Sequence, residues 1–149
     1  LAILEYLADR HPEAGLWPKD AAARAVARAA SAEMHSGFQA LREHCPMKLL
    51  ATEHKAELID PVVTNIRRIV ALWAECRQRF GGRGPFLFSE FSIADAMYAP
   101  VASRFKTYIA DLGAFGDDGT AARYVEAIFS LPAMAEWAEG ARQEMAGAG

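Results

Sequence analysis

The feature that most constrains the fold is a helix start at Ser92, which opens an almost wholly apolar segment over residues 93–108. Ser92 is a favoured N-cap residue, and the carboxylate of Asp95, three positions later, can accept a hydrogen bond from the amide of the cap. A negative charge in the first turn also suits the positive end of the helix dipole. Water cannot repair a frayed first turn in a buried helix, so this double cap predicts a helix at the centre of the fold. We therefore interpret Ser92 and Asp95 as structural residues.

The rest of the chain also predicts helices, because strand signals are almost absent and the apolar residues recur at helical spacing. A long helix is predicted over residues 21–44, ending before Pro46, since the residue before a proline resists helical geometry. Its apolar positions would form one stripe that faces the core. The opposite face would carry Arg24, Arg28, Ser31, His35 and Arg42.

Three further helices follow from the pattern. One begins at Asp60, with Asp60 as the cap and Pro61 as the first helical residue, and it continues to Phe80 with apolar residues at steps of four and three. The last two are predicted over residues 120–129, with Thr120 as the cap, and 133–145. With the central helix, this makes an all-α bundle of about five helices.

Composition excludes several functional classes. The chain has 149 residues and a net charge of −3, which fits one domain and does not favour binding to nucleic acid or to an anionic membrane surface. Its two cysteines, Cys45 and Cys76, lie in no CxxC or Cys/His cluster, so neither a disulfide framework nor a metal site is expected. No apolar run approaches the roughly 20 residues of a membrane span, and no secretory signal is visible. We expect a cytoplasmic protein.

Several segments resemble one family. Residues 86–95 resemble the loop and the [Ser/Thr]-x-x-Asp box that begin the central helix in the C-terminal domain of the soluble glutathione transferases. Residues 1–8 resemble the last helix of that family's thioredoxin-like N-terminal domain, and residues 11–20 its interdomain linker. Residues 32–38 and 131–137 resemble the first and last C-terminal helices of bacterial members. The order of these segments is also that of the family.

The resemblance implies a division into domains. Residues 1–9 would be the last helix of the thioredoxin-like domain, 10–20 the linker, and 21–149 the all-helical C-terminal domain. Most of the thioredoxin-like domain would then be missing, and since the chain has no initiator Met we expect a truncated sequence. In the family, that domain holds glutathione and supplies the Ser, Tyr or Cys that handles the thiol. No catalytic residue is therefore expected in this chain.

The resemblance also implies a substrate pocket, because the first and third C-terminal helices of the family line the site for the hydrophobic co-substrate. The residues that we expect at this site are Met34, Phe38, Tyr98, Arg104 and Tyr108. Core packing is the alternative for the two apolar side chains. Tyr108 is the favoured member, since a phenol at the end of a buried helix needs a polar partner.

The basic stripe on the first helix has two interpretations. It could be a solvated face, or it could belong to a dimer interface, because related enzymes pair through the first two helices of this domain. The expected interface residues are Arg24, Arg28, His35 and Arg42. A catalytic role for His35 is not favoured, since no Cys or Ser nucleophile is positioned with it.

The function implied by the resemblance is that of a homodimeric glutathione transferase of the detoxification type. Glutathione, as co-substrate, would attack a hydrophobic electrophile through its thiolate. One alternative is a maleylacetoacetate isomerase-like enzyme, in which glutathione is a true cofactor. Another is a non-catalytic relative that serves as a protein-interaction module. The residues that precede Leu1 would discriminate between enzyme and module.

Overall fold

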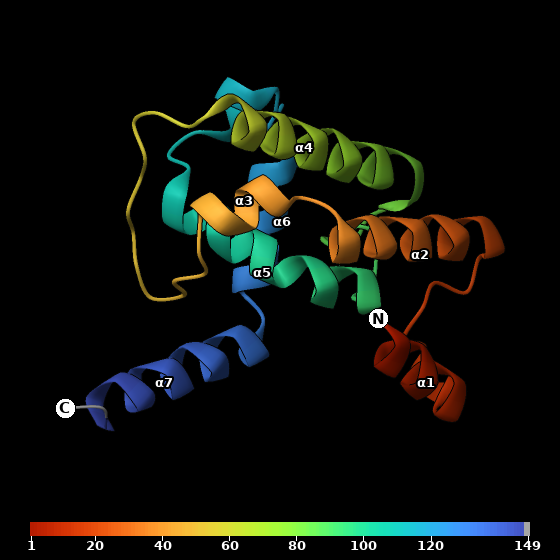
Figure 1. Cartoon of the computed structure of the whole chain (residues 1–149). Coiled ribbons are helices and arrows are strands. Elements are labelled where there is room, and N and C mark those ends of the chain that lie inside the picture. The colour runs from red at the N-terminus through yellow and green to blue at the C-terminus, as the bar shows by residue number, and fades with distance from the viewer. Residues whose placement is uncertain (148–149) are drawn as a thin grey trace.

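The computed structural model describes residues 1–147. All the secondary-structure elements assigned within these residues are helices. Figure 1 shows a central body made of α2 to α6, with α1 and α7 extending from it as two separate arms. The seven α-helices are α1 (Ala2–Arg10), α2 (Ala21–Ser36), α3 (Gln39–His44), α4 (Asp60–Phe80), α5 (Ile93–Tyr108), α6 (Thr120–Phe129) and α7 (Pro132–Gly147). The predicted all-α fold class is confirmed.

Helix α5 lies at the centre, as the double cap predicted. It packs against α2 on one side and α6 on another, while α4 packs against α3 and α6. Three of these helices meet at the fully buried ring of Trp73 on α4. Its centroid lies 5.5 Å from that of Tyr98, 5.3 Å from that of Phe105 and 4.7 Å from that of Tyr124. This aromatic cluster joins α4, α5 and α6 in one core.

The prediction of one helix over residues 21–44 is wrong, because the chain breaks between α2 and α3. Gly37 is extended, and Phe38 takes the left-handed conformation, with φ 58° and ψ 36°. A Cβ atom at Gly37 would lie only 2.7 Å from the carbonyl oxygen of Glu33, so this turn requires glycine. The break turns α3 onto α4 and buries the ring of Phe38.

The burial pattern of α2 also differs from the prediction. Its inward face consists of Ala23, Ala27 and Ala30, and Ser31, which was expected on the basic outer face, is fully buried. The hydroxyl of Ser31 donates a hydrogen bond of 2.8 Å to the carbonyl of Ala27. A serine that satisfies its own hydroxyl within the helix can face a close-packed neighbour, which periodicity cannot distinguish from a solvated serine.

Two predicted caps lie one residue inside their helices. Ile59 precedes α4, so Asp60 stands in the first turn, and Gly119 precedes α6, so Thr120 is its first helical residue. The amides at the start of α6 are satisfied instead by Asp117, which accepts from Ala121 at 2.7 Å. None of the helices within residues 1–147 combines the length and apolarity needed to cross a bilayer.

Candidate functional site

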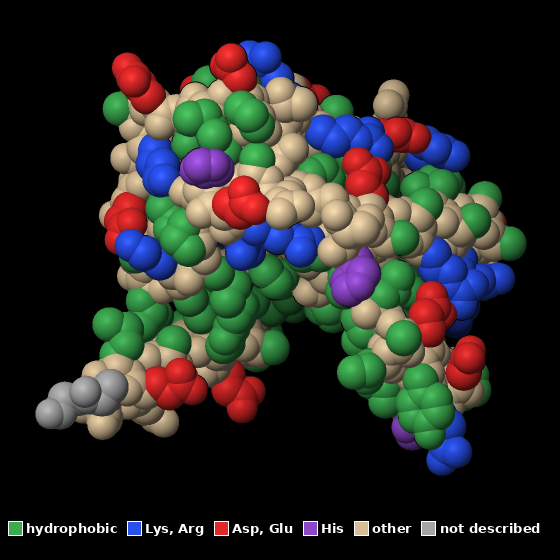
Figure 2. All heavy atoms as spheres, in the orientation of Figure 1, with side chains coloured by type: hydrophobic (Ala, Val, Ile, Leu, Met, Phe, Trp, Pro, Cys, Tyr) green, Lys and Arg blue, Asp and Glu red, His purple; other side chains and the backbone are tan. Residues whose placement is uncertain are grey.

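The surface between the two arms is recessed, and hydrophobic side chains gather there (Figure 2). We call this surface the recess. Helix α1, the arm on one side of the recess, buries none of its residues. It leaves two large side chains strongly exposed, Ile3 at 75% and Tyr6 at 62%. A helix with an exposed apolar face indicates a surface that another structural element covers.

Met34 lies near the C-terminal end of α2. At 100° per residue it falls in line with Ala23, Ala27 and Ala30, the inward face of α2. Those three alanines are at most 5% exposed, yet Met34 remains half-buried although it packs against the core. The inward face of α2 is therefore fully packed at its three alanines and only partly covered at Met34.

One face of α5 is only partly covered. Met97, Pro100 and Arg104 are half-buried and fall on one face of the helix, at spacings of three and four residues. The two helices that pack against α5, α2 and α6, leave this face partly uncovered. Sequence reasoning found Arg104 but missed Met97 and Pro100, although their spacing from Arg104 could have revealed them.

Two guanidinium groups lie close together beside these apolar side chains. Arg104 donates from Nε to the carbonyl of Cys45 at 2.9 Å and from Nη1 to that of Pro100 at 3.0 Å. Arg42 donates to the carbonyls of Met34 and His35 at the end of α2. Burial, with the nearby charge of Arg42, lowers the pKa of Arg104. These partners are neutral carbonyls, and neither arginine forms an ion pair within residues 1–147, so the positive charge of both groups is not compensated there.

The other three residues expected at the substrate site are buried. Phe38 is 7% exposed, Tyr98 is fully buried and Tyr108 is 2% exposed. The Tyr98 hydroxyl donates to the carbonyl of Ala30 at 3.1 Å, and the Tyr108 hydroxyl donates to that of Pro46 at 2.7 Å. The polar partner of Tyr108 is thus a backbone carbonyl of the connector between α3 and α4. A ligand would reach this ring only if the connector moved.

Ser92 and Asp95 form a capping box at the start of α5. One carboxylate oxygen of Asp95 accepts from the amide and the hydroxyl of Ser92, at 2.9 and 3.0 Å. The other accepts from the amide of Leu87, at 3.1 Å, and from the hydroxyl of Tyr124, at 3.0 Å. Burial raises the pKa of Asp95, and these four hydrogen bonds oppose that shift. With every donor supplied from within the core, this carboxylate connects α5, the preceding loop and α6.

The sequence agrees with this geometry. The family model for the glutathione S-transferase C-terminal domain matches residues 19–140. The chain belongs to this family. No curated protein sequence matches it at a significant level. The C-terminal domain of this family is all-helical, as is the structure described here.

The residues expected at a dimer interface of this glutathione S-transferase domain differ in how their side chains are held. Arg24 donates to the backbone carbonyls of Pro18 and Lys19, at 3.0 and 2.9 Å, and Arg42 is held as described above. Arg28 forms an ion pair with Glu5. Only His35 is exposed with no hydrogen bond from its side chain among residues 1–147. Three of the four side chains thus secure the fold of their own chain.

Glu5 connects α1 with Trp17 and with α2. Its carboxylate accepts two hydrogen bonds from Arg28, both 2.9 Å long, and one of 3.1 Å from the indole N–H of Trp17. The guanidinium of Arg28 also lies 5.6 Å from the centroid of the Trp17 ring. The hydrogen bond from Arg28 lowers the pKa of Glu5 below its ordinary 4.5. This network is the main polar attachment of the α1 arm.

Replacing Glu5 by glutamine should loosen α1 without unfolding the body. The bidentate pair is partly exposed, so its loss should cost at most about 1 kcal/mol, which corresponds to roughly fivefold faster amide exchange in α1. Since the folded pKa of Glu5 is lowered, its stabilising effect is present above the unfolded pKa and is lost as the pH falls through the folded value. Hydrogen exchange measured for residues 2–10 tests this.

The matched control is Glu13→Gln, which removes an exposed carboxylate whose one ion pair among the described residues is with His11. Exchange in α1 should not change in this variant. Equal exchange rates in α1 for Glu5→Gln, Glu13→Gln and the parent would show that the Glu5 network does not hold this arm.

Proposed function

We propose that this chain is the C-terminal domain of a glutathione transferase and forms the wall of the pocket for the hydrophobic substrate. The family match over residues 19–140 is the observation on which the proposal rests. The recess supports it, because an apolar surface with an open side suits a largely apolar electrophile. In the proposed reaction, the glutathione thiolate attacks the electrophile, and the residue that activates the thiol belongs to a thioredoxin-like domain.

The thiols of this chain support that division of roles. Cys45 and Cys76 are both buried, and burial raises the pKa of both, that of Cys76 to about 12. A thiol with a raised pKa is a poor nucleophile at neutral pH, because the reactive species is the thiolate. The nucleophilic sulfur would therefore come from glutathione as co-substrate.

Within the wall, the proposal assigns Met34 and Arg104 the contacts nearest to the substrate, because both keep free surface. Phe38, Tyr98 and Tyr108 stay in the proposed site as the buried layer behind it. We further propose that the protein acts in the cytoplasm as a homodimer, with the outer face of α2, including His35, at the interface. Detoxification is the role that such a reaction would serve.

The 149-residue chain alone should bind glutathione weakly or not at all, because the proposal places the tripeptide site in the other domain. Isothermal titration calorimetry should give a dissociation constant no tighter than about 1 mM, equivalent to about −4 kcal/mol. A micromolar constant for this chain alone would contradict the division proposed here.

The positive control is a fusion that places the thioredoxin-like domain of a characterised glutathione transferase before Leu1. We expect this fusion to bind glutathione and to conjugate it to an activated aryl halide. A fusion that binds glutathione but forms no conjugate with any electrophile tested would favour the interaction module.

A further inference from the structure

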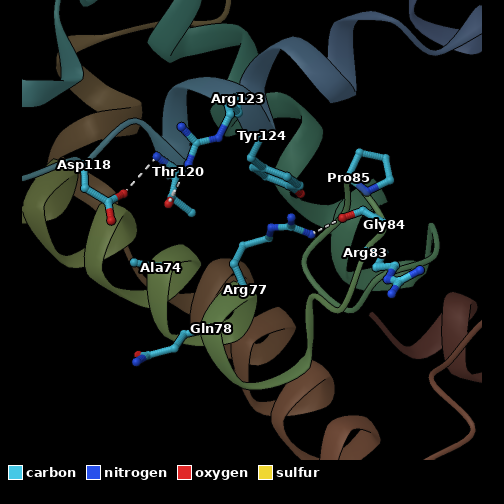
Figure 3. A pocket seen from close by; sticks show the side chains of 10 residues that line it. All are labelled: Ala74, Arg77, Gln78, Arg83, Gly84, Pro85, Asp118, Thr120, Arg123 and Tyr124. Carbon is cyan, nitrogen blue, oxygen red and sulfur yellow. Dashed lines mark hydrogen bonds between the residues drawn. The ribbon is translucent and has the colours of Figure 1, made fainter.

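A second hollow, of about 660 Å³, lies between the C-terminal half of α4, the loop that follows it and the first turn of α6. Figure 3 shows three arginines around it: Arg77 on α4, Arg83 in the loop and Arg123 on α6. Thr120 and Asp118 complete its polar lining on the side of α6. None of the five residues expected at the hydrophobic-substrate site lines this hollow.

The charges around this hollow are unbalanced. Within residues 1–147, none of its three arginines forms an ion pair with a carboxylate. Arginines that do so elsewhere in the domain are Arg28, Arg68, Arg79 and Arg142. The hollow holds one carboxylate, Asp118, which accepts from the amide of Thr120 at 3.0 Å. Three guanidinium groups and one carboxylate leave an excess of two positive charges, in a chain whose net charge is −3.

The three guanidinium groups also have N–H groups to spare. Nη1 of Arg77 donates to the carbonyl of Gly84 at 2.5 Å and also to those of Gly81 and Phe86, so the loop fixes this side chain. Its Nε and Nη2 have no hydrogen-bond partner among the described residues. Arg123 makes one contact, from Nη2 to the Thr120 hydroxyl at 3.2 Å. The loop thus holds the guanidinium group of Arg77 in place, whereas Arg83 and Arg123 are exposed and keep most of their N–H groups free for a ligand.

We propose that this hollow binds the phosphate group of a small molecule. Guanidinium groups donate two parallel hydrogen bonds to phosphate oxygens, a geometry that suits several arginines around one tetrahedral group. An excess of two positive charges matches a phosphomonoester, which is mainly a dianion at about pH 7.5 because its second pKa is about 6.

Titration of the full chain with glycerol 2-phosphate, followed by the backbone amide signals in NMR spectra at constant ionic strength, tests the proposal. We expect saturable shifts confined to residues 74–78, 81–86 and 117–124. The double variant R83Q/R123Q should weaken binding about tenfold or more, the loss expected for two charge-assisted contacts. Both side chains are exposed, so the fold should survive their replacement. The control R67Q removes an exposed arginine on α4 outside the hollow and should bind like the parent.

A parallel titration with inorganic phosphate separates the two sources of the group. Saturable binding of both compounds shows that the phosphate group alone is recognised, and saturable binding of the ester alone shows that the organic part contributes. Either result supports the site. Shifts that never saturate, equal weakening by R67Q, or saturation by citrate but by neither phosphate compound would overturn the proposal.

Discussion

Replacing Asp95 by alanine should lower the free energy of unfolding by about 3 kcal/mol or more. A lost helix cap alone costs about 1–2 kcal/mol. Here the same carboxylate also accepts from Leu87 and Tyr124, and it is fully buried. Its removal leaves buried donors without partners, and each such donor costs about 1–3 kcal/mol unless water reaches it. Urea denaturation followed by circular dichroism measures the change.

Two further variants provide stability changes with which that of Asp95→Ala can be compared. Tyr124→Phe removes one of the four donors and leaves the capping box intact, so we expect a loss of about 1 kcal/mol. Asp9→Ala removes an exposed carboxylate on α1 and should leave stability unchanged. If Asp95→Ala unfolded like the parent but abolished turnover at saturating substrate in the fusion with a thioredoxin-like domain, the structural role of Asp95 would be refuted.

Much of the fold was predictable because it depends on local spacing. The apolar series from Val62 to Phe80 recurs at steps of four and three, and every member of it is buried on α4 except the half-buried Phe80. The box at Ser92 and Asp95 correctly marked the start of the central helix. Both signals lie within a few turns of one helix, where sequence and geometry are directly related.

The break at Gly37 was not predictable in this way, because it depends on a contact that spacing does not encode. The apolar pattern continues through Phe38 to Leu41, so periodicity alone predicts an unbroken helix. Leaving the helix allows α3 to pack on α4, where the amide of Leu41 donates to the side chain of Asn65 at 3.2 Å. Tertiary packing therefore decides the course of the chain at this point.

The candidate site was predictable in its helices but not in its side chains. The resemblance indicated two helices, and Met34 and Arg104 on them keep free surface. It could not indicate that the hydroxyls of Tyr98 and Tyr108 have backbone partners on neighbouring segments. A hydroxyl group on an apolar helix can form its hydrogen bond with a ligand or with a backbone carbonyl. Only the packed structure distinguishes the two cases.

Met34 is half-buried and Tyr98 is fully buried, and this difference leads to a prediction of substrate selectivity. In the fusion with a thioredoxin-like domain proposed above, Met34→Ala should change which electrophile is used and leave the KM for glutathione nearly unchanged. Removing an apolar contact of this size alters discrimination between substrates by about 1–3 kcal/mol, or roughly 10–200-fold in kcat/KM. The measurement is kcat/KM for a panel of electrophiles that differ in bulk.

Tyr98→Phe is the matched control for selectivity, because it removes a buried hydroxyl whose partner is the carbonyl of Ala30. It should lower the melting temperature and reduce activity equally across the panel, since it changes no surface that a substrate could contact. A uniform loss for Met34→Ala, with a similar drop in melting temperature, would identify Met34 as ordinary core. A change in the order of preferred electrophiles for Met34→Ala alone would identify the end of the inward face of α2 as the wall that the substrate contacts.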